Sequence, residues 1–474
     1  DRLGVKPLFY SHLNGVIEVS SSLDVMSSSD KIIDKEAVSA YLQTGYIPSP
    51  LTIYSGIKKV IPGSFVEIDI KTDKLSEKKY WDLSEVEKRK ISYKQAKEEL
   101  HNLIKDAVKI RMISDVPLGS FLSGGIDSAL ISSIANKLSN KKLKTFTIGF
   151  TDQSEYDESK LSKTYSEIIK SDHKLIQCKK NDLFDLIDVL IDKYDEPFGD
   201  SSAIPSILLN KKIKPYLSVA LSGDGGDESF FGYNHFDWGK KVKLAFILPY
   251  FLRRFISFLI PKQLLVKKGK RILNIIKLKS LNDFIERVFI GFDNIIINPS
   301  NKWMKYYSKY LYLSDDFLQN LADLNIKLWL ENDSNVKVDR ASMANSVEVR
   351  SPFLDYRIIE FCRRLPVNYR YSRGKRKKIL KEILSEYIPK AVFDQPKKGF
   401  GIPVKSWIRN ELKLDIISTL SDTNLNKIPN LNVPLIKKYI RLHFKVKQDN
   451  SYEIWRVYIL IKWLDKRKLL DNIA

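Results

Sequence analysis

Two short motifs combine glycines with acidic residues in a spacing that could do chemistry. In SGGIDS, residues 123–128, an apolar run (119–122) leads into two adjacent glycines, and a helix-compatible run (131–138) follows. Adjacent glycines leave backbone N–H groups accessible, and the start of a helix adds its positive end. The pattern therefore predicts a phosphate or pyrophosphate site. It lacks the Gly-Lys-Ser/Thr of a Walker loop and the Gly-x-Gly-x-x-Gly of a dinucleotide loop. A serine-capped helix after an ordinary turn is the alternative.

The second motif is SGDGGDE, residues 222–228. Its glycines permit close ligand approach, and Asp224, Asp227 and Glu228 supply hard oxygen ligands or a proton acceptor. The spacing does not fit a twelve-residue EF-hand loop, and a plain acidic turn is the other reading. If both motifs lie at one sheet edge, the second becomes a further contact for a Mg²⁺-bound nucleotide.

Two more segments combine charged residues with proline or glycine. One is DRASMANSVEVRSPFLD, residues 339–355, and the other is PKKGFGIP, residues 396–403. A lysine beside a glycine, as at Lys397, can stabilise negative charge that develops on phosphorus or on a tetrahedral intermediate. Solvated surface charge beside a loop is the alternative for each segment.

Alternating strands and helices must position these motifs. Strands are expected at 119–122, 144–149, 175–178 and 217–221, with helices at 96–112, 127–138, 159–169 and 183–194. This order predicts a doubly wound parallel sheet, in which ligands sit at the carboxyl ends of strands. Both glycine motifs follow such strands. Strands at 7–10, 16–19 and 64–68 with a helix at 35–43 precede the sheet, a charged linker is expected at 71–89, and the chain reads as largely helical after about residue 240.

The composition bounds the class of protein. With 474 residues, 43% of them hydrophobic, the chain is long enough for two or three domains. Two cysteines and five histidines favour a reducing, cytoplasmic setting and suggest no metal cluster. The net charge of +22 comes from lysines that are spread along the whole chain, and the sequence contains no recognisable nucleic-acid-binding module. The most apolar stretch, 245–260, is too short and too charged to span a bilayer, so a buried helix is expected, with a surface-lying amphipathic helix as the alternative.

The four motifs, in this order, resemble the synthetase domain of glutamine-dependent asparagine synthetases. SGGxDS resembles the pyrophosphate loop of enzymes that adenylate a carboxylate. DEPF (195–198), DSS (200–202) and the opening DRLGVKPLFY (1–10) support the resemblance, the opening being similar to the late part of the family's glutaminase domain. The resemblance implies that ATP and Mg²⁺ serve to adenylate aspartate, that pyrophosphate is released, and that ammonia then gives asparagine and AMP.

The resemblance also implies roles for single residues. Ser123, Gly124, Gly125 and Ser128 would hold pyrophosphate, and Leu122, Ile148, Ser222 and Gly223 would line the nucleotide. Asp127 and Asp227 would hold Mg²⁺. Asp224 would lie near the aminated centre, Lys397 would stabilise charge, and Lys377, in the basic run 373–381, would add a phosphate contact. Glu348, Arg350 and Asp355 would build the pocket wall and its ion pairs.

The expected organisation is a β-rich remnant of an N-terminal-nucleophile glutaminase domain (1–75), a linker (76–91) and a synthetase domain of PP-loop type (92–474). The last divides into an α/β core at about 92–240 and a helical remainder at 241–474. The family's N-terminal cysteine is absent, since Asp1 is the first residue, so the sequence is expected to be a fragment that uses ammonia rather than glutamine. Residues 19–22 also depart from the family, which puts the glutaminase interface in doubt.

Alternatives remain open at this point. The carboxylate could be a uronic acid of a surface polysaccharide. A β-lactam-forming synthetase is disfavoured, because Asp224 stands where that chemistry needs a tyrosine. A non-catalytic nucleic-acid or membrane-binding protein would not need two glycine-acid loops. The expected partners are small molecules, with no nucleic acid, no stable membrane insertion, and a homodimer as one possible assembly.

Overall fold

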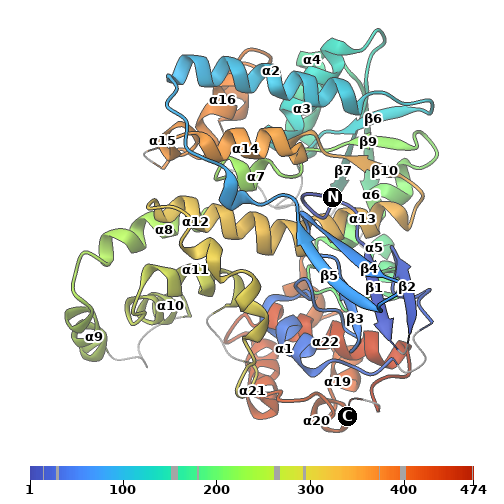
Figure 1. Ribbon diagram of the computed structural model, residues 1–474, viewed down its shortest axis with the longest axis vertical. Helices are drawn as coiled ribbons and strands as arrows, with labels where there is room; N and C mark the ends of the chain where they lie inside the picture. Colours follow the sequence, from blue (N-terminus) through green and yellow to red (C-terminus); the bar gives the residue numbers. More distant parts are fainter. Residues whose placement is uncertain are drawn as a thin grey trace.

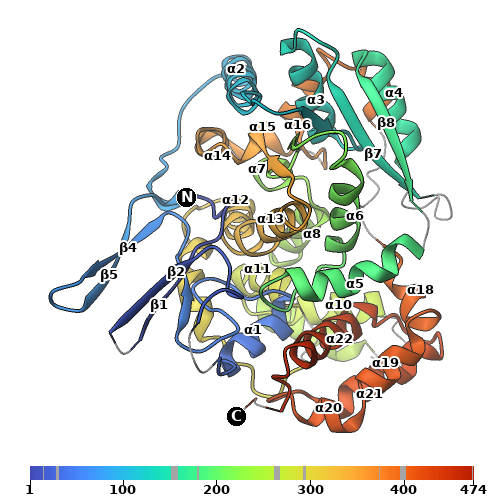
Figure 2. The same cartoon turned by 90° about the vertical axis from the view of Figure 1, so that its right-hand side faces the viewer.

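The computed structural model describes residues 1–13, 15–27, 31–150, 158–178, 181–260, 267–291, 295–372, 374–394, 402–471 and 473. A β-rich N-terminal part lies against a larger α/β part, and helices from the second half of the chain lie around both (Figures 1 and 2).

The N-terminal part contains five strands and one helix. They are β1 (Phe9–Leu13), β2 (Val16–Ser20), β3 (Ile57–Lys59), β4 (Ser64–Asp69), β5 (Lys74–Lys79) and α1 (Lys35–Thr44). Strands β2, β1 and β3 form one sheet in that order, and β4 pairs with β5 in a separate hairpin. The strands predicted near the start of the chain, the one at 64–68 and the helix are found.

Strand β5 corrects the linker expected at 71–89. All its residues are exposed, and its charged sequence has no apolar alternation, so only its backbone pairing with β4 makes it a strand. Residues 76–79, assigned to the linker, thus belong to the hairpin.

A five-stranded parallel sheet forms the centre of the α/β part. Its strands are β6 (Leu118–Phe121), β7 (Lys144–Phe150), β8 (Asp172–Cys178), β9 (Val219–Leu221) and β10 (Glu348–Arg350). The order is β10-β9-β6-β7-β8, and every pair is parallel. The four predicted strands are confirmed. Strand β10 lies in the part expected to be helical, because three residues with charged ends give no strand signal of their own.

The strand order creates a switch point between β6 and β9. From β6 the chain builds outward through β7 and β8, then returns to place β9 on the other side of β6. Ligands of doubly wound sheets bind at the carboxyl ends of strands at such a point. SGGIDS follows β6 and SGDGGDE follows β9, so the fold brings both motifs to one crevice.

Helices cover the sheet and form the rest of the chain. Those of the first half are α2 (Tyr93–Arg111), α3 (Ile126–Leu138), α4 (Ser159–Ile169), α5 (Asn181–Lys193), α6 (Ala203–Ile213), α7 (Gly226–Ser229) and α8 (Asn234–Ala245). The middle holds α9 (Tyr250–Leu259), α10 (Lys267–Ile276), α11 (Leu281–Ile290), α12 (Phe317–Leu324), the π-helical segment η5 (Asn325–Ser334), α13 (Asn335–Met343), α14 (Tyr356–Arg364) and α15 (Val367–Arg370). The last are α16 (Lys378–Leu384), α17 (Lys390–Phe393), α18 (Val404–Arg409), α19 (Lys413–Thr419), α20 (Asp422–Asn426), α21 (Val433–Phe444) and α22 (Ser451–Lys466). Short 3₁₀ turns are η1 (Leu83–Glu85), η3 (Lys302–Tyr306), η4 (Ser308–Leu311) and η6 (Pro352–Leu354).

The stretch 245–260 is not the buried helix that its composition predicts. It forms the end of α8, a turn and α9, and most of its large apolar side chains are exposed. In Figure 1 α9 lies at the left margin, away from the central sheet and from the N-terminal strands. Within the described residues, none of the helices has the length and apolar character needed to cross a membrane.

Helix α2 supports the helix that carries the SGGIDS motif. Ser92 and Gln95 form a capping box at its start. Its apolar face packs on α3 in one core, which includes Leu100, Ile104 and Val108 from α2 and Ile131 and Ile134 from α3. The position of the pyrophosphate loop therefore depends on this helix pair.

Replacing a buried α2 side chain should destabilise the protein, whereas replacing an exposed one should not. Ile104 is fully buried and Ile110 is 48% exposed. We expect Ile104→Ala to cost about 2–5 kcal/mol, since it removes apolar contacts and leaves a cavity. Ile110→Ala is the matched control and should stay close to the parent in urea unfolding. Equal losses in the two variants would contradict this assignment of the core.

Candidate functional site

The SGGIDS loop is held by its own serines. The Ser123 backbone N–H donates to Ser128 Oγ (3.1 Å), and the Gly125 N–H donates to Ser123 Oγ (3.0 Å). The Gly124 N–H donates to the Glu158 carboxylate (3.0 Å), so this backbone N–H binds an anionic oxygen. Helix α3 begins directly after Gly125 without a side-chain cap, so its positive end faces the loop. The serine-capped helix, the alternative for this motif, is not what forms.

The SGDGGDE loop lies directly against SGGIDS. A Cβ on Gly223 would come within 2.7 Å of the Ser128 backbone nitrogen, so only glycine permits this approach. In the same loop, Ser222 Oγ donates to the Asp224 carboxylate. The two loops therefore form one continuous wall at the switch point.

A buried lysine joins the two loops. Lys377 Nζ contacts Asp127 Oδ2 and lies 2.5 Å from Asp227 Oδ1. Burial alone would lower the pKa of Lys377, but the two carboxylates outweigh burial and raise it. The lysine therefore stays charged, and one cation holds both aspartates that the sequence assigned to Mg²⁺.

The backbone around Lys377 is specialised for this contact. Lys377 has φ +53°, in the left-handed region, immediately before α16. A Cβ on Gly232 would lie 1.8 Å from Asp227 Oδ1 and 2.2 Å from Lys377 Cε, so no side chain fits there. The basic run at 373–381 is thus a helix start that points a cation into the site, as expected.

The loops border a cavity of about 610 Å³. Of the predicted site residues, its lining includes Ser123, Gly125, Asp127, Ser128, Ser222, Gly223, Asp224 and Asp227. Lys377 reaches the cavity wall through the two aspartates. Leu122 and Ile148 belong to the hydrophobic cores and are not among the lining residues, so their contact with the nucleotide stays a prediction. Lys397 lies outside the described residues, so its role stays a prediction.

The cavity also holds a protonatable carboxylate. Burial, and then the charge of Asp227, raise the pKa of Glu228 to about 7, and Tyr233 OH donates to it (2.6 Å). A group with this pKa can accept a proton near neutral pH. Its position in the motif was visible in the sequence, whereas its full burial was not.

A half-buried ion pair lies elsewhere on the cavity wall. Lys337 Nζ is 3.0 Å from Asp200 Oδ2, and both residues line the cavity. Burial would lower the pKa of Lys337, but Asp200 and Asp333 raise it. Arg376 and Trp329 line the same cavity. The sequence analysis missed Lys337, Arg376 and Trp329, because nothing in their local sequence marks a site.

Glu348, Arg350 and Asp355 form ion pairs, as expected. Arg350 Nε is 2.8 Å from Glu348, and Arg111 is 3.1 Å from Asp355. Arg350 also donates to the Ile113 carbonyl (2.6 Å), which ties β10 to the end of α2. Strand β10 contributes Val349 to the cavity lining, whereas Glu348, Arg350 and Asp355, expected in the pocket wall, are not among the lining residues.

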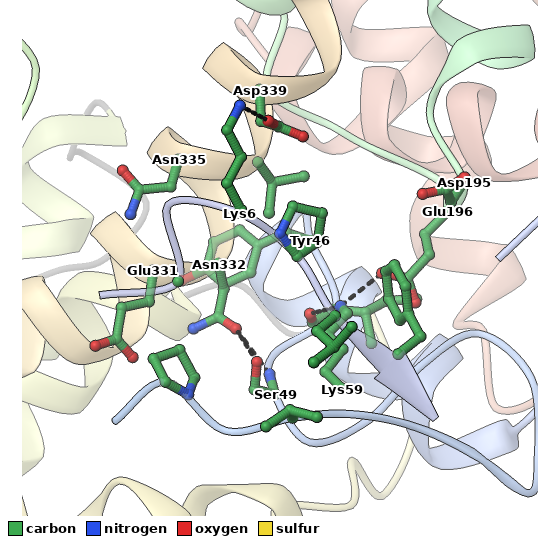
Figure 3. A pocket seen from close by; sticks show the side chains of 18 of the residues that line it. Lys6, Tyr46, Ser49, Lys59, Asp195, Glu196, Glu331, Asn332, Asn335 and Asp339 are labelled. Carbon is green, nitrogen blue, oxygen red and sulfur yellow. Dashed lines mark hydrogen bonds and ion pairs between the residues drawn. The ribbon is translucent and has the colours of Figure 1, made fainter. Parts of the chain in front are cut away.

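A second cavity, of about 110 Å³, lies between the N-terminal part and the segment η5–α13 (Figure 3). Lys59 lies 2.5 Å from Glu196, and Lys6 lies 2.6 Å from Asp339. A small void of about 10 Å³ shares Lys6 and Asp339 with this cavity and Asp224 with the larger one. The three spaces thus form a series from the N-terminal part to the SGDGGDE loop.

The N-terminal part contacts the α/β part through Ser21 and Ser22. Ser22 Oγ donates to Asp195 Oδ1 (2.6 Å), and Arg340 donates to the Ser21 carbonyl (2.8 Å). The serines therefore make an ordered interface with DEPF and with Arg340.

Parallel strands whose switch point carries two glycine-acid loops define an α/β nucleotide-dependent synthetase of the PP-loop type. The family model described as asparagine synthase matches residues 99–465, and that described as a glutamine amidotransferase domain matches residues 1–81. The chain belongs to the asparagine synthase family.

Similar proteins agree with this membership. Asparagine synthetase [glutamine-hydrolyzing] 1 of Bacillus subtilis is 28% identical, over 100% of this chain and 76% of its own length. A Methanocaldococcus jannaschii protein with the provisional name asparagine synthetase [glutamine-hydrolyzing] 2 is 37% identical, over 53% of this chain and 50% of its own length. Asparagine synthetase [glutamine-hydrolyzing] 3 of Bacillus subtilis is 26% identical, over 84% and 64%.

Removing the lysine between the aspartates should destabilise the protein strongly. Lys377→Met leaves two neighbouring buried carboxylates without their shared cation, and breaking such a buried pair costs about 3–5 kcal/mol. The loss should shrink as the pH falls, because protonation removes the repulsion between the carboxylates. Urea unfolding over a pH series measures both effects.

Lys375→Met is the control for this experiment, since Lys375 is exposed two residues away. It should unfold like the parent at every pH. A Lys377→Met protein as stable as the Lys375→Met protein at neutral pH would show that the lysine does not hold the loops.

Proposed function

We propose that this protein uses ATP to amidate a carboxylate through an acyl-adenylate, converting aspartate to asparagine with release of AMP and pyrophosphate. The observation that carries the proposal is the joining of SGGIDS and SGDGGDE at one switch point through Lys377, Asp127 and Asp227. Backbone N–H groups and the start of α3 would bind the pyrophosphate portion of ATP. Family membership supports the same reaction.

The proposal includes Mg²⁺. Among the described residues no group of three or more His, Cys, Asp or Glu could hold a metal ion. Mg²⁺ at nucleotide sites, however, takes one or two carboxylates, and phosphate oxygens and water complete its shell. Asp127 and Asp227 fit that donor set, because one ammonium already reaches both. The ion would neutralise phosphate charge and so ease the attack of a carboxylate on ATP.

The charges at Lys337 and Asp200 favour an amino acid as the substrate. A cation and an anion 3.0 Å apart on the cavity wall can exchange partners with the α-carboxylate and α-ammonium of aspartate. A uronic acid has no ammonium for Asp200 to bind. Amidation of a uronic acid is therefore the second candidate, and no contact in the site favours it.

The proposed nitrogen donor is ammonia, either free or released from glutamine. Cys178 and Cys362 are buried, and burial raises the pKa of the Cys362 thiol to about 12, so neither supports glutamine hydrolysis. Ammonia would pass from the smaller cavity toward Asp224.

The proposed setting is the cytoplasm, where ATP is abundant and free thiols persist. The partners of the site are small molecules rather than nucleic acid, and a homodimer is compatible with the proposal.

Exchange of labelled pyrophosphate into ATP tests the adenylation step. We expect exchange with Mg²⁺ and aspartate, and none with glucuronate or galacturonate. Asp127→Asn and Asp227→Asn should each lower the rate about 100- to 1000-fold, as loss of a direct charge contact does.

The control is Asp73→Asn, which changes an exposed carboxylate on the β4–β5 turn and should leave the rate unchanged. Exchange with a uronic acid and none with aspartate would show that the substrate is the uronic acid. No exchange with any acid, by a protein that unfolds cooperatively, would refute adenylation.

Glu228 should act as the base that takes the proton from the attacking nitrogen. Its pKa of about 7 predicts that asparagine formation from saturating ammonia rises with pH through neutrality. Glu228→Gln should lower asparagine formation far more than pyrophosphate exchange, because exchange precedes the attack. Measuring the two reactions side by side across a pH series separates the steps.

Tyr233→Phe offers a finer version of this test. The Tyr233 hydrogen bond lowers the pKa of Glu228, so its removal should move the midpoint of the pH profile upward while the maximal rate is kept. An unmoved midpoint would assign the profile to another group.

A further inference from the structure

Helix α9 presents its apolar side chains to solvent, while two of its polar side chains, Arg253 and Ser257, face the protein. Its exposed apolar residues are 39–85% exposed, and we call them the apolar face of α9: Phe251, Leu252, Phe255, Ile256, Phe258 and Leu259. The buried positions of the same helix are Arg253 (4% exposed) and Ser257 (3%). This orientation is the reverse of that of a surface helix in a globular protein.

Arg253 fixes this orientation. Its guanidinium donates to the carbonyls of Leu248 (3.0 Å), Ile276 (2.9 Å) and Leu278 (3.0 Å), and it stacks on the Phe246 ring at 3.7 Å. The arginine thus occupies backbone carbonyls at the ends of α8 and α10, and it turns the opposite side of α9 outward. A rotation of α9 that buried its phenylalanines would break all three hydrogen bonds.

The sequence around α9 carries an extreme charge. Residues 238–282 contain twelve Lys or Arg and no Asp or Glu, so this segment supplies more than half of the net charge of +22. Lys240, Lys241, Lys243 and Arg254 are exposed. Lysines and arginines occur along the whole chain, as expected, but in this segment no acidic residue offsets them.

We propose that the apolar face of α9 and the basic residues around it bind the surface of an anionic lipid bilayer. An interfacial helix buries aromatic and aliphatic side chains at the headgroup boundary, while flanking lysines and arginines attract anionic lipid. Both requirements are met in one segment. The protein would associate peripherally, since α9 has ten residues and cannot span a membrane.

The same charges argue against other occupants. A symmetric contact between two copies would place one basic segment against another, and like charges disfavour that interface. Nucleic acid would satisfy the lysines, but it would leave the aliphatic side chains without a partner. The N-terminal part is not near enough to cover the helix, because Figure 1 places α9 and the N-terminus far apart.

Vesicle flotation tests the proposal with the whole chain. The protein should float with vesicles of equal parts phosphatidylcholine and phosphatidylglycerol, but not with phosphatidylcholine alone. The triple variant Phe251→Gln/Phe255→Gln/Phe258→Gln should lower the partition coefficient at least about tenfold, since three apolar side chains no longer enter the bilayer. Lys240→Gln/Lys241→Gln/Lys243→Gln should lower it about tenfold or more, and high salt should weaken binding of the parent.

The matched control is Ile70→Gln/Ile113→Gln/Leu414→Gln, which replaces side chains 87, 74 and 81% exposed elsewhere on the surface. It should float like the parent, and all variants should share the parent's thermal unfolding midpoint.

Absence of flotation, or equal flotation of the phenylalanine variant and this control, would overturn the proposal. If the parent sedimented as a dimer and only the phenylalanine variant as a monomer, the apolar face of α9 would instead bind a second copy of the chain. Binding of RNA in place of vesicles would assign it to nucleic acid. None of these outcomes depends on adenylation.

Discussion

The contact of Lys377 with Asp127 and Asp227 is the interaction on which the site depends. It joins three segments that are about a hundred or more residues apart in the chain: the start of α3, the loop after β9 and the start of α16. Two carboxylates this close would repel each other in a buried place without a cation between them. The lysine allows the acidic loops to fold together, and the acidic loops keep the lysine charged. The remaining features, such as the left-handed backbone at Lys377 and the absence of a side chain at Gly232, serve this contact.

The fold of the central sheet could be predicted because its signals are local. Buried parallel strands are short apolar runs, and the glycine motifs that follow them mark their carboxyl ends. Strands β5 and β10 could not be predicted in the same way, since their charged residues become strands only by pairing with β4 and β9. The alternation of strands and helices predicts that a switch point exists. It does not predict that β9 pairs with β6 on the side opposite to β7, because that pairing depends on the whole fold.

The residues of the site also fall into two groups: those that a local motif predicts and those that only the folded chain brings together. Asp127, Asp224 and Asp227 stand in motifs, so their spacing alone marked them. Lys337 belongs to helical sequence that reads as ordinary surface, and it becomes a site residue only because η5 and α13 pass between two cavities. Leu122, next to the motif, has its side chain in a hydrophobic core, so its predicted contact with the nucleotide is not decided by its place in the sequence. Burial is a sum over distant neighbours, and for that reason the pKa of about 7 at Glu228 follows from the structure and not from the motif.

Helix α9 shows why hydrophobicity alone does not predict burial. Its composition satisfies the usual rule for a core helix, but its direction is set by Arg253, which requires the carbonyls that the neighbouring helices leave open at their ends. The arginine therefore decides which side of the helix is solvated, and the phenylalanines must follow. A surface of this kind is costly in water, and its place in a sequence segment with twelve basic and no acidic residues fits an environment that is both apolar and negatively charged. The acidic side chains that line the cavity at the switch point and the basic residues of the α9 segment thus lie in two separate parts of the chain.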